Sequence, residues 1–266
     1  MDSVFFNKQY AELLDKNFPE PEADLNFISG RLGNLNQELK YKEVKRLFFE
    51  LDDLVQQARW HIGILINIAK TFPDKEISKD DPSGGRMVIE TMLLLREFVV
   101  NNKNVNFEDL NEDRKGGKVY GWIYHMFVDN VIFRVFGVLD RIARILAEIR
   151  NVKFSNNKVY FKSGKLEAIH REFNYEETQK LLDMSKEHAF EFLISYRDGY
   201  SHSKKEFSVV AGSVPAISYT DEGGKRNHED GHLWKTQDLL ALTNMAYTYT
   251  TRAVKELKII IEKEYR

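Results

Sequence analysis

Apolar residues recur at helical spacing along four long stretches of this sequence. In each of them an apolar residue returns every three or four positions, which is typical of a helix with one buried face. The spacing predicts long helices over 36–71, 118–150, 175–198 and 236–265. Pro73 ends the first of these, because proline removes a backbone donor and clashes inside a helix. The stretch 118–150 is apolar on more than one face, so we expect it at the centre of a bundle.

Along the sequence, the segments between the long helices carry shorter patterns. Clusters of proline, glycine and asparagine mark the turns, and brief alternation of apolar and polar residues indicates short strands. The expected short elements are helices over 4–17, 86–101 and 165–172, a linker running through Gly33, small hairpins at 153–161 and 205–219, and a polar loop over 220–232.

These elements predict an all-α protein, a mainly antiparallel helical bundle with extra N-terminal helices and a small β-hairpin insertion. Residues 1–35 are expected to form an N-terminal helix and linker packed on the bundle. Residues 36–266 are expected to form the helical domain, with the hairpin excursion near 205–219.

Composition narrows the classes of function. Of the 266 residues, 42% are hydrophobic, which is enough for a sizeable core, and the formal net charge of −2 argues against a globally basic nucleic-acid binder. The chain has no cysteine, which excludes disulfides and thiolate chemistry. No apolar run is long enough to span a membrane and no signal peptide is recognisable, so we expect a cytoplasmic protein.

The segment 197–202, which reads RDGYSH, carries the strongest chemical signal in the chain. Arginine presents a planar fork of donors that holds two phosphate oxygens, and histidine can take or return a proton near neutral pH. On a continuous helix Arg197 and His202 would lie about 140° apart and diverge. Gly199 is a natural helix stop, because glycine adopts the left-handed conformation at little cost. A break there would let His202 fold back towards Arg197.

Other polar residues extend this candidate site. Asp198 is placed to orient the imidazole or the guanidinium, and Lys204 and Lys205 add positive charge for RNA or phosphate. Arg134, within the apolar stretch 118–150, either forms a satisfied internal polar pair or lines the same cleft; the first reading is the commoner one for such residues. No metal site is expected.

A second match to the looser pattern R-x(4–6)-H shows that this pattern alone is a weak signal. Arg226 and His232 enclose a polar segment in the predicted loop before the last helix. His228 and His232, with the acidic residues between them, superficially suggest a metal site, but their spacing matches no common zinc motif, so a solvated loop is the better interpretation.

A helix that ends in arginine, a polar residue, three further residues and histidine, inside an all-α bundle, resembles the HEPN superfamily. Arg197, Asp198 and His202 match the R-(polar)-x3-H pattern position by position, and the resemblance covers residues 36–266. It is nearest to a bacterial branch of larger HEPN proteins. The resemblance implies a HEPN-like bundle and metal-independent endoribonuclease activity in a homodimer, without a cofactor, in toxin–antitoxin, phage-defence or RNA-processing settings. It also implies an antitoxin or nucleotidyltransferase as partner.

Two positions depart from the family pattern. Asp198 stands where active members more often carry asparagine, and a carboxylate repels a phosphate. Lys204 stands where members controlled by nucleotidyl transfer carry tyrosine. Some members of the superfamily are inactive, so a non-catalytic HEPN module that binds a nucleotide, RNA or a protein partner is the alternative. A purely structural helical protein is the third hypothesis.

Overall fold

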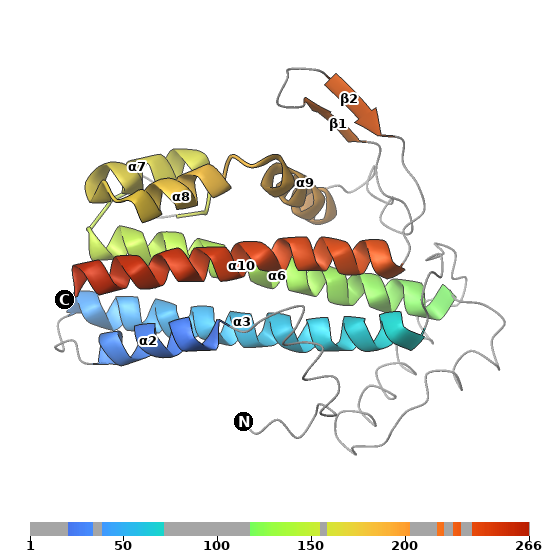
Figure 1. The fold of residues 1–266 in the computed structure, drawn as a ribbon, viewed down its shortest axis with the longest axis horizontal. Coiled ribbons are helices and arrows are strands. Elements are labelled where there is room, and N and C mark those ends of the chain that lie inside the picture. Colours follow the sequence, from blue (N-terminus) through green and yellow to red (C-terminus); the bar gives the residue numbers. More distant parts are fainter. Residues whose placement is uncertain are drawn as a thin grey trace, which may run out of the picture. The chain divides into compact units, whose positions relative to one another are not determined.

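The computed structural model describes residues 21–33, 39–71, 118–154, 159–202, 217–220, 226–229 and 236–265 (Figure 1). Helices dominate these residues, which confirms the all-α class. The helices predicted over 4–17 and 86–101, and most of the hairpin predicted at 205–219, lie outside the described residues. The described helices and strands are α2 (Glu22–Gly33), α3 (Leu39–Thr71), α6 (Lys118–Ile149), α7 (Ser163–Phe173), α8 (Glu176–Met184), α9 (His188–His202), β1 (Ile217–Thr220), β2 (Arg226–Glu229) and α10 (Thr236–Glu264).

The chain divides into two compact units. We call the larger one the helical body; its described residues are 21–33, 39–61, 130–154, 159–197 and 243–265. The described residues of the second unit are 62–71, 118–129, 198–202, 217–220, 226–229 and 236–242.

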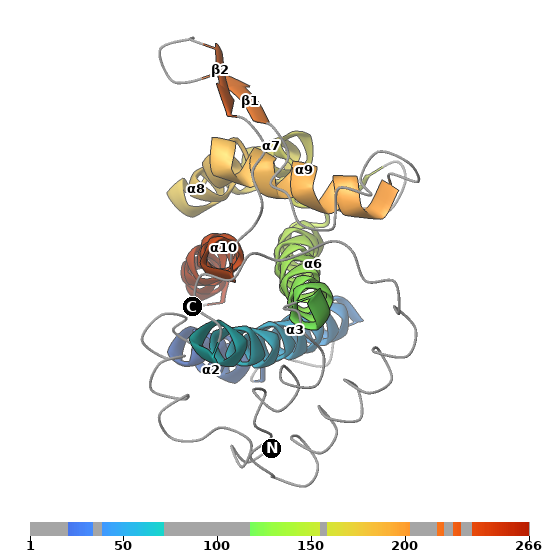
Figure 2. The same cartoon turned by 90° about the vertical axis from the view of Figure 1, so that its right-hand side faces the viewer.

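The helical body has three layers of helices (Figures 1 and 2). Helices α6 and α10 form the middle layer, with α2 and α3 on one side and α7, α8 and α9 on the other. The middle position of α6 confirms the expectation from its apolar faces, because it buries side chains towards both neighbouring layers. Its fully buried residues in the helical body include Val131, Val135, Val138, Leu139, Ile142, Ile145 and Leu146.

Helix α2 occupies the segment where a linker was predicted, so that prediction is wrong. Pro21 directly precedes the helix, and its carbonyl accepts the N–H of Leu25 at 2.8 Å. Proline is tolerated at this end of a helix because the first turn lacks intrahelical partners for its N–H groups. Lys258 of α10 donates to Asp24 at 2.7 Å. The buried face of α2 consists of Leu25, Ile28 and Leu32.

Helices α3 and α6 approach closely in the helical body. A Cβ atom added at Gly137 would lie 3.0 Å from Cδ1 of Leu54, so only glycine permits this spacing without a shift of the leucine. The close approach brings the polar edges of the two helices within reach of each other.

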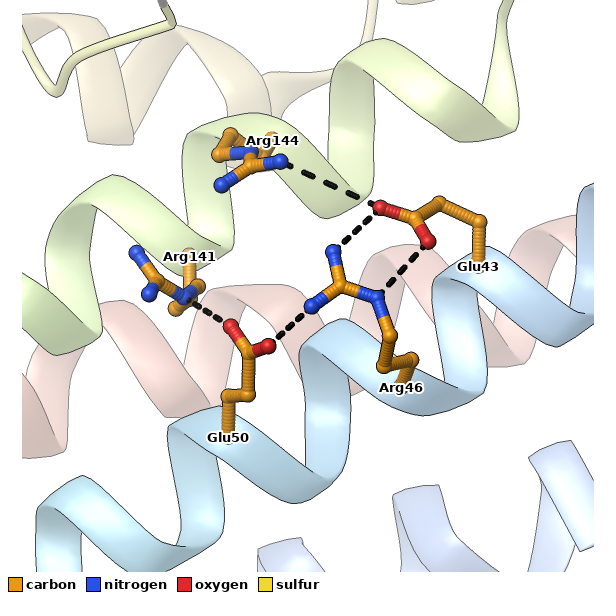
Figure 3. Close-up of polar contacts among 5 residues, drawn as sticks. All are labelled: Glu43, Arg46, Glu50, Arg141 and Arg144. Atoms are coloured by element: carbon orange, nitrogen blue, oxygen red, sulfur yellow. Dashed lines mark hydrogen bonds and ion pairs between the residues drawn. The ribbon is translucent and has the colours of Figure 1, made fainter.

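A network of charged side chains joins the edges of α3 and α6 (Figure 3). Arg46 donates to Glu43 at 2.6 and 2.8 Å and also to Glu50, all within α3. Arg141 of α6 donates to Glu50 at 2.6 Å, and Arg144 lies 3.9 Å from Glu43. The five side chains are partly exposed, so their contribution to stability is small.

The helix predicted over 175–198 is divided into α8 and α9 by a tight turn, which corrects the prediction. The carbonyl of Glu187 accepts the N–H groups of Phe190 and Glu191 at 2.9 and 3.0 Å and so begins α9. Its carboxylate accepts from Arg252 at 2.5 and 2.9 Å and from the hydroxyl of Tyr249 at 2.7 Å, both on α10. The break is therefore fixed by tertiary contacts rather than by proline or glycine.

Strands β1 and β2 pair antiparallel, with Ile217 opposite Glu229 and Thr220 opposite Arg226. The polar loop predicted over 220–232 is thus partly wrong, because Arg226–Glu229 is a strand. A ladder needs only backbone groups, so polar residues can form it when the chain turns back. The hairpin predicted at 153–161 is absent from its described residues, 153–154 and 159–161. In the part of the chain that the structure describes, no helix is apolar over enough of its length to cross a membrane.

Candidate functional site

Arg197 is held on an aromatic platform. It lies on α9 and is half-buried, and its guanidinium carbon is 4.3 Å from the ring centroid of Phe136 on α6. A cation over an aromatic face is attracted by the negative charge density of the ring. Phe136 is 4% exposed and packs against Phe190 at 5.5 Å, which in turn packs against Phe161 at 5.6 Å. The ring beneath the guanidinium is therefore fixed by its own neighbours.

Asp140 is the polar residue that the structure adds to this site. It follows Phe136 by one turn of α6, so the two side chains share a face of the helix. Its Oδ1 accepts the backbone N–H of Phe161 at 2.7 Å. Burial raises the pKa of Asp140 above its ordinary range, and the hydrogen bond from Phe161 opposes this rise. Three positive charges near the carboxylate also oppose it: Arg197, Arg141 and Lys162.

The sequence does not single out Asp140, because a lone carboxylate on an amphipathic helix resembles any partly exposed polar residue. Its one sequence signal is the spacing of four from Phe136 in an apolar helix. Phe161, which donates to it, and Arg197, whose charge acts on its pKa, come from other segments of the chain, so only the tertiary fold brings them near it.

The rest of the motif lies in the last turn of α9. The structure continues α9 through Gly199 to His202, which corrects the predicted helix end at Asp198. Positions 197 and 202 of a continuous helix lie about 140° apart around its axis. The side chains of Asp198 and His202 are outside the described part of the structure, so their roles stay predictions.

Arg134 faces a different neighbour from Arg197. Its Nε donates to Oε1 of Gln57 on α3 at 3.1 Å, and its Nη1 donates to Oδ1 of Asn130 at 3.3 Å. Positions 134 and 136 lie about 200° apart around α6, so Arg134 and the platform of Arg197 are on opposite faces. The structure thus supports the internal polar pair and does not bring Arg134 to Arg197.

The two lysines predicted to attract phosphate, Lys204 and Lys205, lie outside the described residues. The phosphate-binding part of the prediction therefore depends on Arg197 alone within the residues that the structure describes.

The histidines described on other helices make local contacts. His61 is buried and donates from Nδ1 to the carbonyl of Gln57 at 2.7 Å, and burial lowers its pKa. Nδ1 of His170 lies 2.9 Å from the hydroxyl of Thr178 and joins α7 to α8. His228 is in β2, while His232 lies outside the described residues. Among the residues described, no group of three or more histidine, aspartate or glutamate side chains is arranged to hold a metal.

No protein-family model, no curated protein and no solved structure matches the chain. Its function must therefore be inferred from its own residues and from the HEPN-like pattern that three of them form.

Proposed function

We propose that the protein is a HEPN-like, metal-independent endoribonuclease that acts as a homodimer, with Arg197 as the phosphate contact and His202 as the proton carrier. One observation carries this proposal: the arginine of the R-(polar)-x3-H pattern is mounted on a fixed aromatic ring and remains partly exposed. A guanidinium held in this way loses little side-chain freedom when it binds a phosphate.

The chemistry needs only these side-chain types and the RNA itself. The 2′-hydroxyl of a ribose attacks the adjacent phosphorus and loses its proton to a base. The bond from phosphorus to the 5′-oxygen breaks, and that oxygen takes a proton from an acid. The products are a 2′,3′-cyclic phosphate and a 5′-hydroxyl. Arg197 would stabilise the charge that builds on the phosphate oxygens, and imidazoles would serve as base and acid.

A second copy of the chain is part of the proposal. One histidine cannot act as base and acid in the same concerted step, and an unbroken α9 directs positions 197 and 202 away from each other. Two chains related by a two-fold axis supply two arginines and two histidines to one composite cleft. The family resemblance also supports a cytoplasmic role in toxin–antitoxin systems or phage defence, with an antitoxin or nucleotidyltransferase as partner.

A non-catalytic module that binds a nucleotide, RNA or a protein partner is the second candidate. The continuation of α9 through Gly199 favours it, because the predicted fold-back of His202 onto Arg197 required a break there. The formal net charge of −2 agrees with it as well, since promiscuous affinity for RNA depends on lysine and arginine.

Cleavage of structured RNA in EDTA separates the two candidates. The wild type is compared with His202→Ala and with a control on the same helix, His188→Ala, whose side chain is 59% exposed. The endoribonuclease is supported by fragments that end in a cyclic phosphate, made by the wild type and the control but not by His202→Ala. Binding without cleavage by all three proteins would favour the second candidate. Cleavage unaffected by His202→Ala would contradict the proposed site.

A further inference from the structure

Helix α3 carries a large apolar side chain in the middle of its solvent face. Phe49 is 63% exposed, the highest value among the large hydrophobic residues that the structure describes. It lies about 160° around the helix from the fully buried Leu51, so it points away from the core of the helical body. Single exposed apolar residues are common on protein surfaces, so the neighbours of Phe49 decide whether it marks a contact surface.

The exposed residues of α3 within the helical body form one stripe, with alternating spacings of four and three positions. This stripe, which we call the α3 stripe, consists of Lys42, Arg46, Phe49, Asp53, Gln56 and Trp60. The same spacing is found where one helix packs lengthwise against another. Trp60, 37% exposed, is the second large apolar residue of the stripe. The α3 stripe therefore has the geometry of a second packing face, on the side of the helix away from the core.

The charge along this face of α3 changes sign at Phe49. The basic residues before it are Lys42, Lys45 and Arg46, and the acidic residues after it are Asp52 and Asp53. Arg46 belongs to the network of Figure 3, in which three arginines meet two glutamates, so the first half of the stripe stays basic. Asp53 accepts from the neutral amide of Gln57 at 2.6 Å, which does not neutralise its charge. The second half is therefore acidic.

A second copy of α3, laid antiparallel across Phe49, matches this order of charges. A two-fold axis at position 49 places Phe49 against Phe49 of the second copy, and it places Lys45 opposite Asp53 of the second copy twice over. An axis midway between Phe49 and Trp60 would instead leave Lys45 opposite Ile64, without an acidic partner. The charges therefore favour the register that is centred on Phe49.

We infer that the α3 stripe is an interface between two copies of this chain, paired antiparallel about Phe49. A desolvated aromatic side chain at the centre anchors such an interface, and the two contacts between Lys45 and Asp53 fix its orientation. Helices α3 and α9 lie in opposite outer layers of the helical body, so this contact is separate from the composite cleft and does not rest on the proposed function (Figures 1 and 2). A chain that uses both contacts assembles beyond a dimer.

Reversing single charges tests the pairing. Asp53→Lys makes both halves of the stripe basic, and Lys45→Asp makes the facing positions acidic, so neither variant should associate with itself through α3. A mixture of the two variants should associate, because every facing pair then joins opposite charges. In sedimentation velocity, we expect the Kd of this association to rise about tenfold or more for each variant alone, and to return towards the wild-type value in the mixture.

The matched control is Asp183→Lys on α8. Asp183 is an exposed carboxylate that accepts from the glutamine four positions away at 2.7 Å, as Asp53 does, but it lies outside the α3 stripe. This variant should associate like the wild type. None of these substitutions lies on α9, so a dimer formed through the composite cleft persists in all of them, and failure of one contact is distinguishable from failure of the other.

A cysteine at the two-fold axis tests the register. The chain has no cysteine, so Phe49→Cys carries a single thiol, and mild oxidation should link two copies through it. We expect this link to form at least about tenfold faster than in the control Tyr160→Cys, because the interface holds the two thiols at a high effective concentration. Tyr160 is 42% exposed and lies outside α3.

Three results would overturn the inference. The first is equal linking of Phe49→Cys and Tyr160→Cys, or charge-reversed variants that associate like the wild type. The second is linking of Phe49→Cys chains to Trp60→Cys chains in preference to one another, which would move the axis away from Phe49. The third is a Phe49→Cys thiol that is shielded from a thiol reagent in a monomeric protein, because another part of the same chain would then cover the stripe.

Discussion

The guanidinium of Arg197 lies 4.3 Å over the ring of Phe136, and this contact joins α9 to α6. The contact links Arg197 of the sequence motif, which remains partly exposed, to Phe136 in the buried middle layer of the helical body.

This contact predicts coupling between the two residues. Phe136→Leu keeps most of the apolar volume and should lower the free energy of unfolding by about 1 kcal/mol. In an Arg197→Met background the loss should shrink by about 0.5 kcal/mol, the part due to the cation over the ring. Urea unfolding of the four proteins measures the coupling, with Phe49→Leu at a 63% exposed position of α3 as control. Equal losses in both backgrounds would show that the contact between Arg197 and Phe136 does not contribute to stability.

The path of α9 through Gly199 predicts the effect of Gly199→Ala. Inside a helix, alanine is more stable than glycine by about 0.5–1 kcal/mol. At a left-handed helix end, which the sequence alone predicted, the same change would be destabilising. We therefore expect a higher midpoint of thermal unfolding for Gly199→Ala, with Gly30→Ala, in α2 where an added Cβ meets nothing within 4 Å, as the reference for a helical glycine. A lower midpoint would place the helix end at Gly199.

The turn between α8 and α9 predicts a dependence of stability on pH. The hydrogen bonds from Arg252 lower the pKa of Glu187, and the bond from Tyr249 adds to this. Its unfolded form therefore binds a proton more readily, so the stabilisation is present above the ordinary pKa of about 4.3 and disappears as pH falls through the lower folded value.

Glu187→Gln should accordingly cost about 0.5–1 kcal/mol at pH 7, a value reduced by the partial exposure of the pair. The difference from the wild type should shrink below pH 4 in urea unfolding. Glu167→Gln, whose partner Lys186 is 3.3 Å away and half-exposed, is the control with little expected effect at either pH. A difference that stays constant with pH would contradict the assignment to ionised Glu187.

The docking of α2 predicts a large effect from one side chain. Ile28 is fully buried, so Ile28→Ala should lower the free energy of unfolding by about 2–5 kcal/mol through lost burial and the cavity left behind. The exposed neighbour Asn26→Ala should change stability by less than about 0.5 kcal/mol. A small effect of Ile28→Ala would mean that α2 contributes little to the helical body.

The apolar periodicity of the sequence correctly predicted the three long helices α3, α6 and α10. Each has about 30 residues of regular apolar spacing, which few other structures would fit. Local sequence signals gave wrong predictions where tertiary contacts determine the secondary structure. The segment before Gly33 was predicted as a linker, yet Leu25 and Ile28 lie on a buried face and the segment forms the helix α2. The break before α9 depends on Glu187, whose partners on α10 lie 62 and 65 positions away in the sequence.

The candidate site was predictable only in part, for the same reason. The spacing of Arg197 and His202 is visible in the sequence, but their neighbours are not. Gly199 suggested a helix end because its local preference allows one, whereas α9 continues. The sequence left two readings of Arg134 open, an internal polar pair or a phosphate contact in the cleft, and its partner Gln57 on α3 could not be named from the sequence.

Mixing wild-type chains with His202→Ala chains tests the composite cleft most directly. Native mass spectrometry first establishes that mixed dimers form, and RNA cleavage in EDTA is then measured per wild-type chain. If one cleft needs a histidine from each chain, the rate per wild-type chain falls to about half at equal amounts and about a quarter at threefold excess of the variant. A rate per wild-type chain that stays constant although mixed dimers are present would contradict the account.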